Sequence, residues 1–168
     1  KNVIDNVKQG VVVPTTSQGV TITQNELRTI SDPYGDTTQK IVLQGAANGG
    51  LTPPTFSIDP ATMTIWKTLS DDKMFVTEIG GVLPKNGTIE LFERTCPALP
   101  GKNCVVKDYF RASCPTVQND KGQFEFKCTG LSVDAAIGQV FTNVTYTPNT
   151  SAMTQLINVK DIPDKQFT

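Results

Sequence analysis

Histidine is absent from the 168 residues of this sequence. Its absence removes the commonest general base, and with it catalysis of the Ser-His-Asp and Cys-His types. The sequence also lacks a basic run, because its formal net charge is −1 and its acidic and basic residues are interspersed. Proteins that bind nucleic acid or anionic membranes concentrate lysine and arginine, so we expect no nucleic-acid partner.

Targeting segments are missing as well. The sequence opens with KNV and contains no signal peptide, transmembrane run or lipidation motif. We therefore expect an extracellular or cell-surface domain, periplasmic before assembly, whose export element has been removed. Contact with a membrane would be made only through a removed N-terminal helix. The length suits a single secreted globular domain spanning residues 1–168.

All four cysteines lie between residues 96 and 128, at Cys96, Cys104, Cys114 and Cys128. An even number of cysteines favours structural disulfides, which form in oxidising compartments. Zinc sites use close pairs such as C-x2-C, whereas these cysteines are separated by 7, 9 and 13 residues, so we expect no metal site. Of the three possible pairings, the sequential one closes the shortest loops, and we favour it over the nested arrangement. Residues 96–128 are thus a predicted disulfide-stapled region.

The N-terminal segment carries a helical pattern. Residues 1–9 place Val3, Ile4 and Val7 on one helical face, and Gly10 ends the segment. Further on, Thr23 and Glu26 have the spacing of a capping box, which predicts a second helical segment to about residue 29. We expect a short N-terminal helix that packs on a sheet.

Strand patterns dominate the remainder, because the sequence is rich in threonine and valine, with glycine and proline between the runs. The expected strands are 40–44, 55–58, 62–66, 73–79, 88–93, 123–127, 139–147 and 155–159. The run 139–147 alternates, with one face formed by Val140, Thr142, Val144 and Tyr146. Residues 45–54 are expected to form a flexible loop. The predicted fold class is α+β, mainly antiparallel β, with the short N-terminal helix packed on an antiparallel sheet.

Carboxylates offer the main route to catalysis. Asp71 with Asp72, or Glu90 with Glu93, could form an acid–base pair, although adjacent acids in a turn are far more often just solvated. Two further aspartates flanking a glycine, Asp32 and Asp36, could contact Ca²⁺, but their spacing falls short of the EF-hand pattern. We expect no catalytic, cofactor or metal site.

Aromatic residues and sequons are the remaining candidates. A sugar-stacking surface could be formed by Tyr34, Trp66, Tyr109 and Phe110. Single aromatics in strands belong more often to the core, which we favour here. Asn86, Asn143 and Asn149 each begin a glycosylation sequon, which matters only in a eukaryotic source.

Two short motifs carry a family resemblance. Residues 32–35 (DPYG), followed at once by a strand, are similar to the Asn/Asp-Pro-aromatic-Gly turn that leads into the pilin sheet. Residues 74–81 (MFVTEIGG) are similar to a pilin strand that ends in threonine and paired glycines. Together with the short opening helix and a cysteine-closed loop in the later half, they make the chain resemble the globular heads of type IV pilin-like proteins, particularly the type IVb and minor-pilin branch.

The resemblance covers about the first half of the chain. It departs from the family in lacking the hydrophobic helix and in carrying four cysteines, since pilins more often have one disulfide. The resemblance implies a helix packed on an antiparallel sheet, assembly into an extracellular fibre or at its tip, and no catalysis.

We therefore expect a non-enzymatic structural or adhesive subunit of a cell-surface fibre. Its partners would be other fibre subunits or a surface receptor, contacted through residues 45–54 and 96–128. The alternative is a free secreted β-rich binding module, such as an inhibitor or a carbohydrate-binding domain. A small secreted hydrolase that uses paired carboxylates is a third hypothesis.

Overall fold

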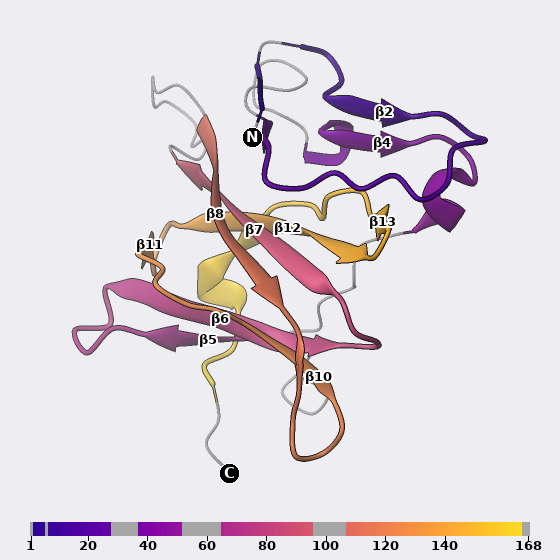
Figure 1. The fold of residues 1–168 in the computed structure, drawn as a ribbon. Helices are drawn as coiled ribbons and strands as arrows, with labels where there is room; N and C mark the ends of the chain where they lie inside the picture. Colours follow the sequence, from indigo (N-terminus) through magenta and orange to yellow (C-terminus); the bar gives the residue numbers. More distant parts are fainter. Residues whose placement is uncertain (1, 6, 28–36, 52–64, 96–106, 166–168) are drawn as a thin grey trace.

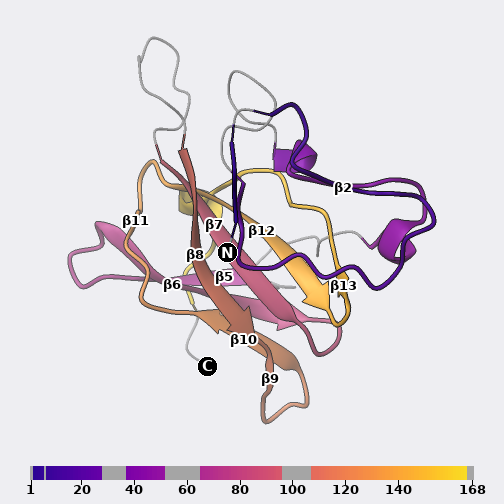
Figure 2. The same ribbon diagram turned by 45° about the horizontal axis from the view of Figure 1, so that its top comes forward.

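The computed structural model describes residues 2–5, 7–27, 37–51, 65–95 and 107–165 (Figures 1 and 2). These residues form mostly antiparallel strands. The helical residues among them belong to three short 3-10 segments: η1 (Thr37–Gln39), η2 (Ala47–Gly50) and η3 (Val159–Asp161).

A first sheet is built around β6 (Phe75–Leu83), which pairs antiparallel with β5 (Ile65–Leu69), β10 (Phe124–Cys128) and β11 (Val133–Asp134). β9 (Val117–Gln118) extends this sheet beyond β10. The C-terminal segment adds to β5 through a parallel bridge between Lys67 and Asp164.

A second sheet has the order β13-β12-β7-β8, with β14 also paired to β12. Its strands are β7 (Thr88–Thr95), β8 (Lys107–Pro115), β12 (Gln139–Tyr146), β13 (Asn149–Thr150) and β14 (Ile157–Asn158). The β7–β12 register places Asn143 opposite Glu90. A register shift between Leu91 and Phe92 marks an irregularity in the β7–β8 ladder.

The N-terminal residues form a third layer of two small parallel pairs. β1 (Val3–Ile4) pairs with β3 (Glu26–Leu27), and β2 (Val11–Val13) pairs with β4 (Ile41–Leu43). In Figure 1 this layer lies on one side of β7 and β12, and β5 and β6 lie on the other.

The second sheet is therefore the middle layer, and both of its faces are buried. Ile89, Leu91, Val140 and Val144 pack with the first sheet in one core, and Phe92 and Phe141 pack with the N-terminal layer in another. The rings of Phe92 and Phe141 are stacked, with centroids 5.2 Å apart. This packing explains why every residue of 140–145 is buried. In a strand covered on both faces, buried and exposed residues do not alternate.

The predicted N-terminal helix is wrong. Val3 and Ile4 lie in β1, and the amide of Glu26 donates to the carbonyl of Asn2 at 2.8 Å, so the capping-box segment is also extended. A helix of nine residues is marginal in water, and β-branched residues gain more from pairing with a strand. Among the described residues there is no α-helix. The α+β class is therefore corrected to mainly antiparallel β.

The strand predictions fared better. Those for 40–44, 88–93, 123–127 and 139–147 match β4, β7, β10 and β12. The strand predicted at 73–79 runs from 75 to 83, and the one at 155–159 overlaps β14 only in part. The strand predicted at 62–66 coincides with β5 at residues 65–66, and its residues 62–64 lie outside the described part. Residues 55–58 lie outside the described part. Within the expected loop 45–54, Ala47 and Asn48 are buried in η2, whereas residues 45, 46, 49 and 50 are exposed; residues 52–54 lie outside the described part.

Candidate functional site

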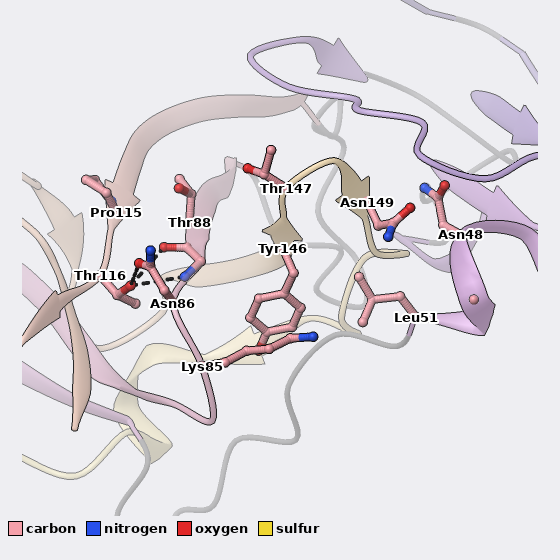
Figure 3. A pocket seen from close by; sticks show the side chains of 12 residues that line it. Asn48, Leu51, Lys85, Asn86, Thr88, Pro115, Thr116, Tyr146, Thr147 and Asn149 are labelled. Carbon is pink, nitrogen blue, oxygen red and sulfur yellow. Dashed lines mark hydrogen bonds between the residues drawn. The ribbon is translucent and has the colours of Figure 1, made fainter. Parts of the chain in front are cut away.

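An open groove of about 820 Å³ lies at one end of the middle sheet. Four segments line it: residues 48–51, the β6–β7 turn and the start of β7 at 85–88, the end of β8 with the residue that follows at 115–116, and the β12–β13 turn at 146–149 (Figure 3). The ladders β12–β7 and β7–β8 align Thr88 with Thr145 and Pro115, which brings three of these segments together.

Asn48 fixes the fourth segment to the others. Its Oδ1 accepts from the amide of Val20 at 2.8 Å, and its Nδ2 donates to the carbonyls of Val20 at 2.8 Å and Thr150 at 3.1 Å. Its φ of +49° is one that asparagine tolerates better than most residues. This buried side chain therefore attaches η2 to β13.

Two other asparagines keep donors directed toward solvent. The Oδ1 of Asn86 accepts from the hydroxyl of Thr116 at 2.7 Å, and the Oδ1 of Asn149 accepts from the amide of Gly19 at 2.8 Å. No hydrogen bond from either Nδ2 is present among the described residues. Because both oxygens are occupied, each side chain offers the groove its NH₂ group.

The aromatic element of the groove is Tyr146, whose ring lies beside Lys85 (Figure 3). The Nζ of Lys85 is 4.5 Å from the ring centroid. Gly87 packs against the ring closely, because a Cβ at that position would lie 2.7 Å from Cδ1 of Tyr146. Burial raises the pKa of the Tyr146 hydroxyl.

Among the described residues, twelve line the groove, and they include one lysine and no carboxylate. The groove therefore presents hydroxyls, amide donors, one ammonium group and one aromatic ring. This set suits the binding of a polar ligand rich in hydrogen-bond acceptors, and its lining contains no pair of acidic groups for acid–base chemistry.

The disulfide Cys114–Cys128 is present, which confirms one half of the sequential pairing. It joins β8 of the middle sheet to β10 of the first sheet, and both cysteines are buried. Cys96 and Cys104 lie outside the described residues.

Of the carboxylate pairs considered as candidates for acid–base chemistry, Glu90 and Glu93 are not brought together. Glu90 and Glu93 are three residues apart on a strand and so point to opposite faces. Glu93 accepts from Arg111 at 2.9 Å near the surface. Asp72 lies in an exposed turn, where the hydroxyl of Ser70 donates to it and lowers its pKa.

Glu90 itself is buried in the middle sheet and is 1% exposed. Its carboxylate accepts from the amide of Gln24 at 2.6 Å, and Gln24 adopts a φ of +53° to make this contact. Burial raises the pKa of the Glu90 carboxyl, and the hydrogen bond from Gln24 opposes that effect.

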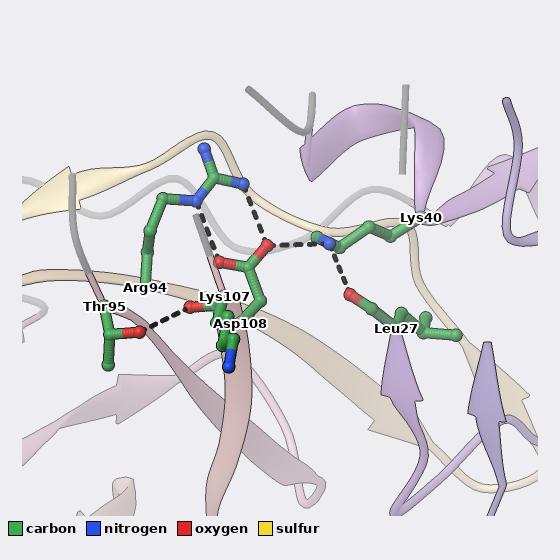
Figure 4. A network of polar contacts seen from close by, with 6 residues as sticks. All are labelled: Leu27, Lys40, Arg94, Thr95, Lys107 and Asp108. Atoms are coloured by element: carbon green, nitrogen blue, oxygen red, sulfur yellow. Dashed lines mark hydrogen bonds and ion pairs between the residues drawn. The ribbon is translucent and has the colours of Figure 1, made fainter. Parts of the chain in front are cut away.

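A buried ion cluster joins the N-terminal layer to the middle sheet (Figure 4). Lys40 contacts Asp108 at 2.8 Å, and Arg94 donates to both oxygens of the same carboxylate at 2.8 and 2.9 Å. The Nζ of Lys40 also donates to the carbonyl of Leu27. Burial lowers the pKa of Lys40, and the charge of Asp108 opposes that effect. Sequence reasoning could not find this cluster, because its three charged residues lie on three different strands or turns.

The aromatic residues singled out from the sequence do not form one surface. Trp66 is buried and packs over Gly80, where a Cβ would lie 2.3 Å from its ring. Phe110 packs edge-on against Phe92, with centroids 5.7 Å apart, and the guanidinium of Arg111 lies over Tyr109. Tyr34 lies outside the described residues. Tyr146, the aromatic residue of the groove, was assigned only to a strand face.

The sequon asparagines differ in access. Asn143 is 1% exposed, whereas Asn86 and Asn149 line the groove.

Among the residues that the structure describes, no group of acidic, histidine or cysteine side chains could hold a metal ion, and no helix is long and apolar enough to cross a membrane. The calcium candidates Asp32 and Asp36 fall outside that part.

No family model, curated protein or solved structure matches this chain.

Proposed function

We propose that this protein is a non-catalytic adhesive domain that works outside the cytoplasm and binds its partner through the groove. The observation that carries the proposal is the set of described lining residues, which combines amide donors, hydroxyls, one ammonium group and an aromatic ring and includes no carboxylate. Binding pockets of polar ligands place a few polar groups and an aromatic side chain in this way.

The disulfide supports the extracellular assignment. Disulfides persist in oxidising compartments and are rare where thiols are kept reduced. Cys114–Cys128 is buried between two sheets, which is the position of a structural disulfide and gives no access to a reactive partner.

Filling the groove tests the proposal. Thr147 is an exposed lining residue, and the variant Thr147→Trp would place an indole in the groove. We expect this variant to lose binding to a glycan array or to target cells while its free energy of unfolding in urea stays within about 0.5 kcal/mol of the parent's, as is usual for surface changes. The matched control is Gln155→Trp, an exposed residue outside the groove. Equal binding by both variants would refute the groove as the binding surface.

A second candidate function, a subunit of an extracellular fibre, is favoured by exposed apolar side chains at the two ends of the first sheet. Met74, Phe75 and Ile137 lie at the start of β6 and the adjacent turn, and are 60%, 38% and 54% exposed. Val117, 70% exposed, is aligned through β10 with the other end of β6. Distinct patches at opposite ends suit a head-to-tail contact between copies, which generates open filaments when it does not close.

Charged substitutions test this arrangement. Met74→Lys should block one end of each subunit and Val117→Lys the other, so each variant alone should stay monomeric by sedimentation. An equimolar mixture should form dimers and nothing longer, since one productive pair of ends remains. Filaments formed by either single variant would exclude head-to-tail assembly through these patches.

A further inference from the structure

We propose that the groove binds an acidic sugar, with the sugar ring on Tyr146 and its carboxylate on Lys85. The inference rests on the binding function proposed above and names the chemical class of the ligand.

The ring of Tyr146 provides the surface on which a sugar ring would stack. Tyr146 is half-buried at the end of β12, and its ring edge lies against the backbone of Gly87 with no room for a side chain there. The ring is therefore held in one orientation before a ligand arrives. Rigid aromatic groups of this kind offer a large contact area at little cost in conformational entropy.

The ammonium group of Lys85 provides the positive charge for a ligand carboxylate. Lys85 lies with its Nζ 4.5 Å from the Tyr146 centroid, and it makes no ion pair in the described part of the chain. A cation–π contact at an exposed site is weak, so a sugar that stacks on the ring can displace the ammonium. The described residues that line the groove include no carboxylate, so a carboxylate on the ligand would be the oppositely charged partner of the displaced ammonium, which water otherwise solvates.

The third feature of the groove is its pattern of hydrogen-bond donors. Asn86 and Asn149 have their side-chain oxygens occupied by Thr116 and Gly19 and present NH₂ groups. With Lys85, the charged and amide groups that face the ligand are thus donors. The carboxylate of an acidic saccharide only accepts, and its hydroxyls can accept from these donors and donate to the threonine hydroxyls of the groove, whereas the backbone N–H groups of a peptide can only donate.

The experiment compares sialyllactose with its neutral parent lactose, measured by titration against the purified domain. We expect the acidic trisaccharide to bind about tenfold more tightly than lactose. Lys85→Met should remove that preference and leave lactose binding intact, Lys85→Arg should retain it, and Tyr146→Leu should weaken both sugars at least tenfold. The matched control is Lys165→Met, because Lys165 lies over Trp66 at 4.4 Å, a similar pair outside the groove.

Other outcomes separate the inference from the function on which it rests. If neutral and acidic sugars bind equally and Thr147→Trp abolishes both, the groove is a saccharide site and the acidic ligand class is refuted. If hexaglutamate binds more tightly than sialyllactose and Tyr146→Leu leaves it unaffected, the site recognises an acidic peptide, and the inference is again overturned. If no sugar or peptide binds and Thr147→Trp does not change adhesion, the proposed function fails with it.

Discussion

Replacing Asp108 by asparagine should destabilise the fold strongly. Asp108 is the shared carboxylate of Lys40 and Arg94, which are 0% and 4% exposed. Asparagine keeps the shape of the side chain but leaves the Lys40 ammonium without its buried anion. Removing one partner of a buried ion pair costs roughly 3–5 kcal/mol. This is a large share of the ~5–15 kcal/mol that stabilises a typical domain.

Replacing Lys40 should cost much less. In Lys40→Met the carboxylate of Asp108 keeps both hydrogen bonds from Arg94, and the new side chain lies near the ring of Phe141, as the Lys40 Nζ does at 5.5 Å. Because Asp108 keeps its ion pair with Arg94, Lys40→Met leaves no buried charge without a partner, and the penalty for an uncompensated buried charge does not arise. We expect a change within about 1 kcal/mol, the scale of the lost hydrogen bond to Leu27.

Urea unfolding measures the free energies of unfolding of the two single variants and the double variant. The conditions should be neither oxidising nor reducing, so that the disulfide is preserved. With slopes of ~1–3 kcal/mol/M, the loss of roughly 3–5 kcal/mol in Asp108→Asn should lower the midpoint by roughly 1–5 M. The double variant should be more stable than Asp108→Asn alone, because it no longer buries an unpaired ammonium. A loss below about 1 kcal/mol for Asp108→Asn, or equal losses for both single variants, would refute the role assigned to the shared carboxylate.

Three further predictions concern stability. Folding raises the pKa of Glu90 above the ordinary 4.5, so the native state binds the proton more tightly, and stability is lost as the pH rises from 4.5 through the folded pKa. Glu90→Gln should therefore be more stable than the parent at pH 7. Urea midpoints should show this difference shrinking toward pH 4.5. Replacing Cys114 and Cys128 by alanine opens a loop with a sequence separation of 14 and should cost ~2–4 kcal/mol by thermal unfolding. Gly80→Ala places a Cβ 2.3 Å from an indole carbon and should cost at least ~1–3 kcal/mol by urea unfolding.

Each of these predictions has its own control. Glu93→Gln removes a surface carboxylate and should not reproduce the pH effect of Glu90→Gln; the same pH profile in both variants would contradict the burial argument. The disulfide variant should unfold like the parent measured in strong reductant. Gly130→Ala, where no atom lies within 4 Å but φ is +70°, should cost about 1 kcal/mol for backbone reasons alone. A Gly80→Ala variant as mild as that one would mean that Trp66 moves aside.

Local sequence patterns predicted the long strands, in which neighbouring residues already carry the strand signal. Residues 88–93 and 139–147 were predicted as strands from their own residues, and the alternation that places Val140 and Val144 on one face was part of that prediction. The structure shows that this face packs against the first sheet. The helix predicted at the N-terminus was wrong because the pairing there depends on residues far away in the sequence. Val3 and Ile4 have helical spacing relative to Val7, but their partners, Glu26 and Leu27, are more than twenty residues away, and a local pattern carries no information on a distant parallel partner.

The groove could not be predicted for the same reason. Its residues come from four segments between positions 48 and 149, and only the three-layer packing brings them together. Asn48 shows the difficulty: from the sequence it belongs to a glycine-rich loop, and in the structure it is 2% exposed with three hydrogen bonds. Asn86 and Asn149 did carry a signal as sequon residues, but that signal concerned modification and not ligand binding.

The disulfide between β8 and β10 has a mechanical consequence. Force applied to the two ends of the chain would pass along β8 to Cys114, cross the sulfur–sulfur bond and continue from Cys128, so that residues 115–127 would carry no load. Those 13 residues would shorten the stretched chain by about 45 Å. Pro115 and Thr116, which form one wall of the groove, belong to this unloaded loop. A domain that holds a ligand while being pulled would thereby keep that wall out of the line of tension.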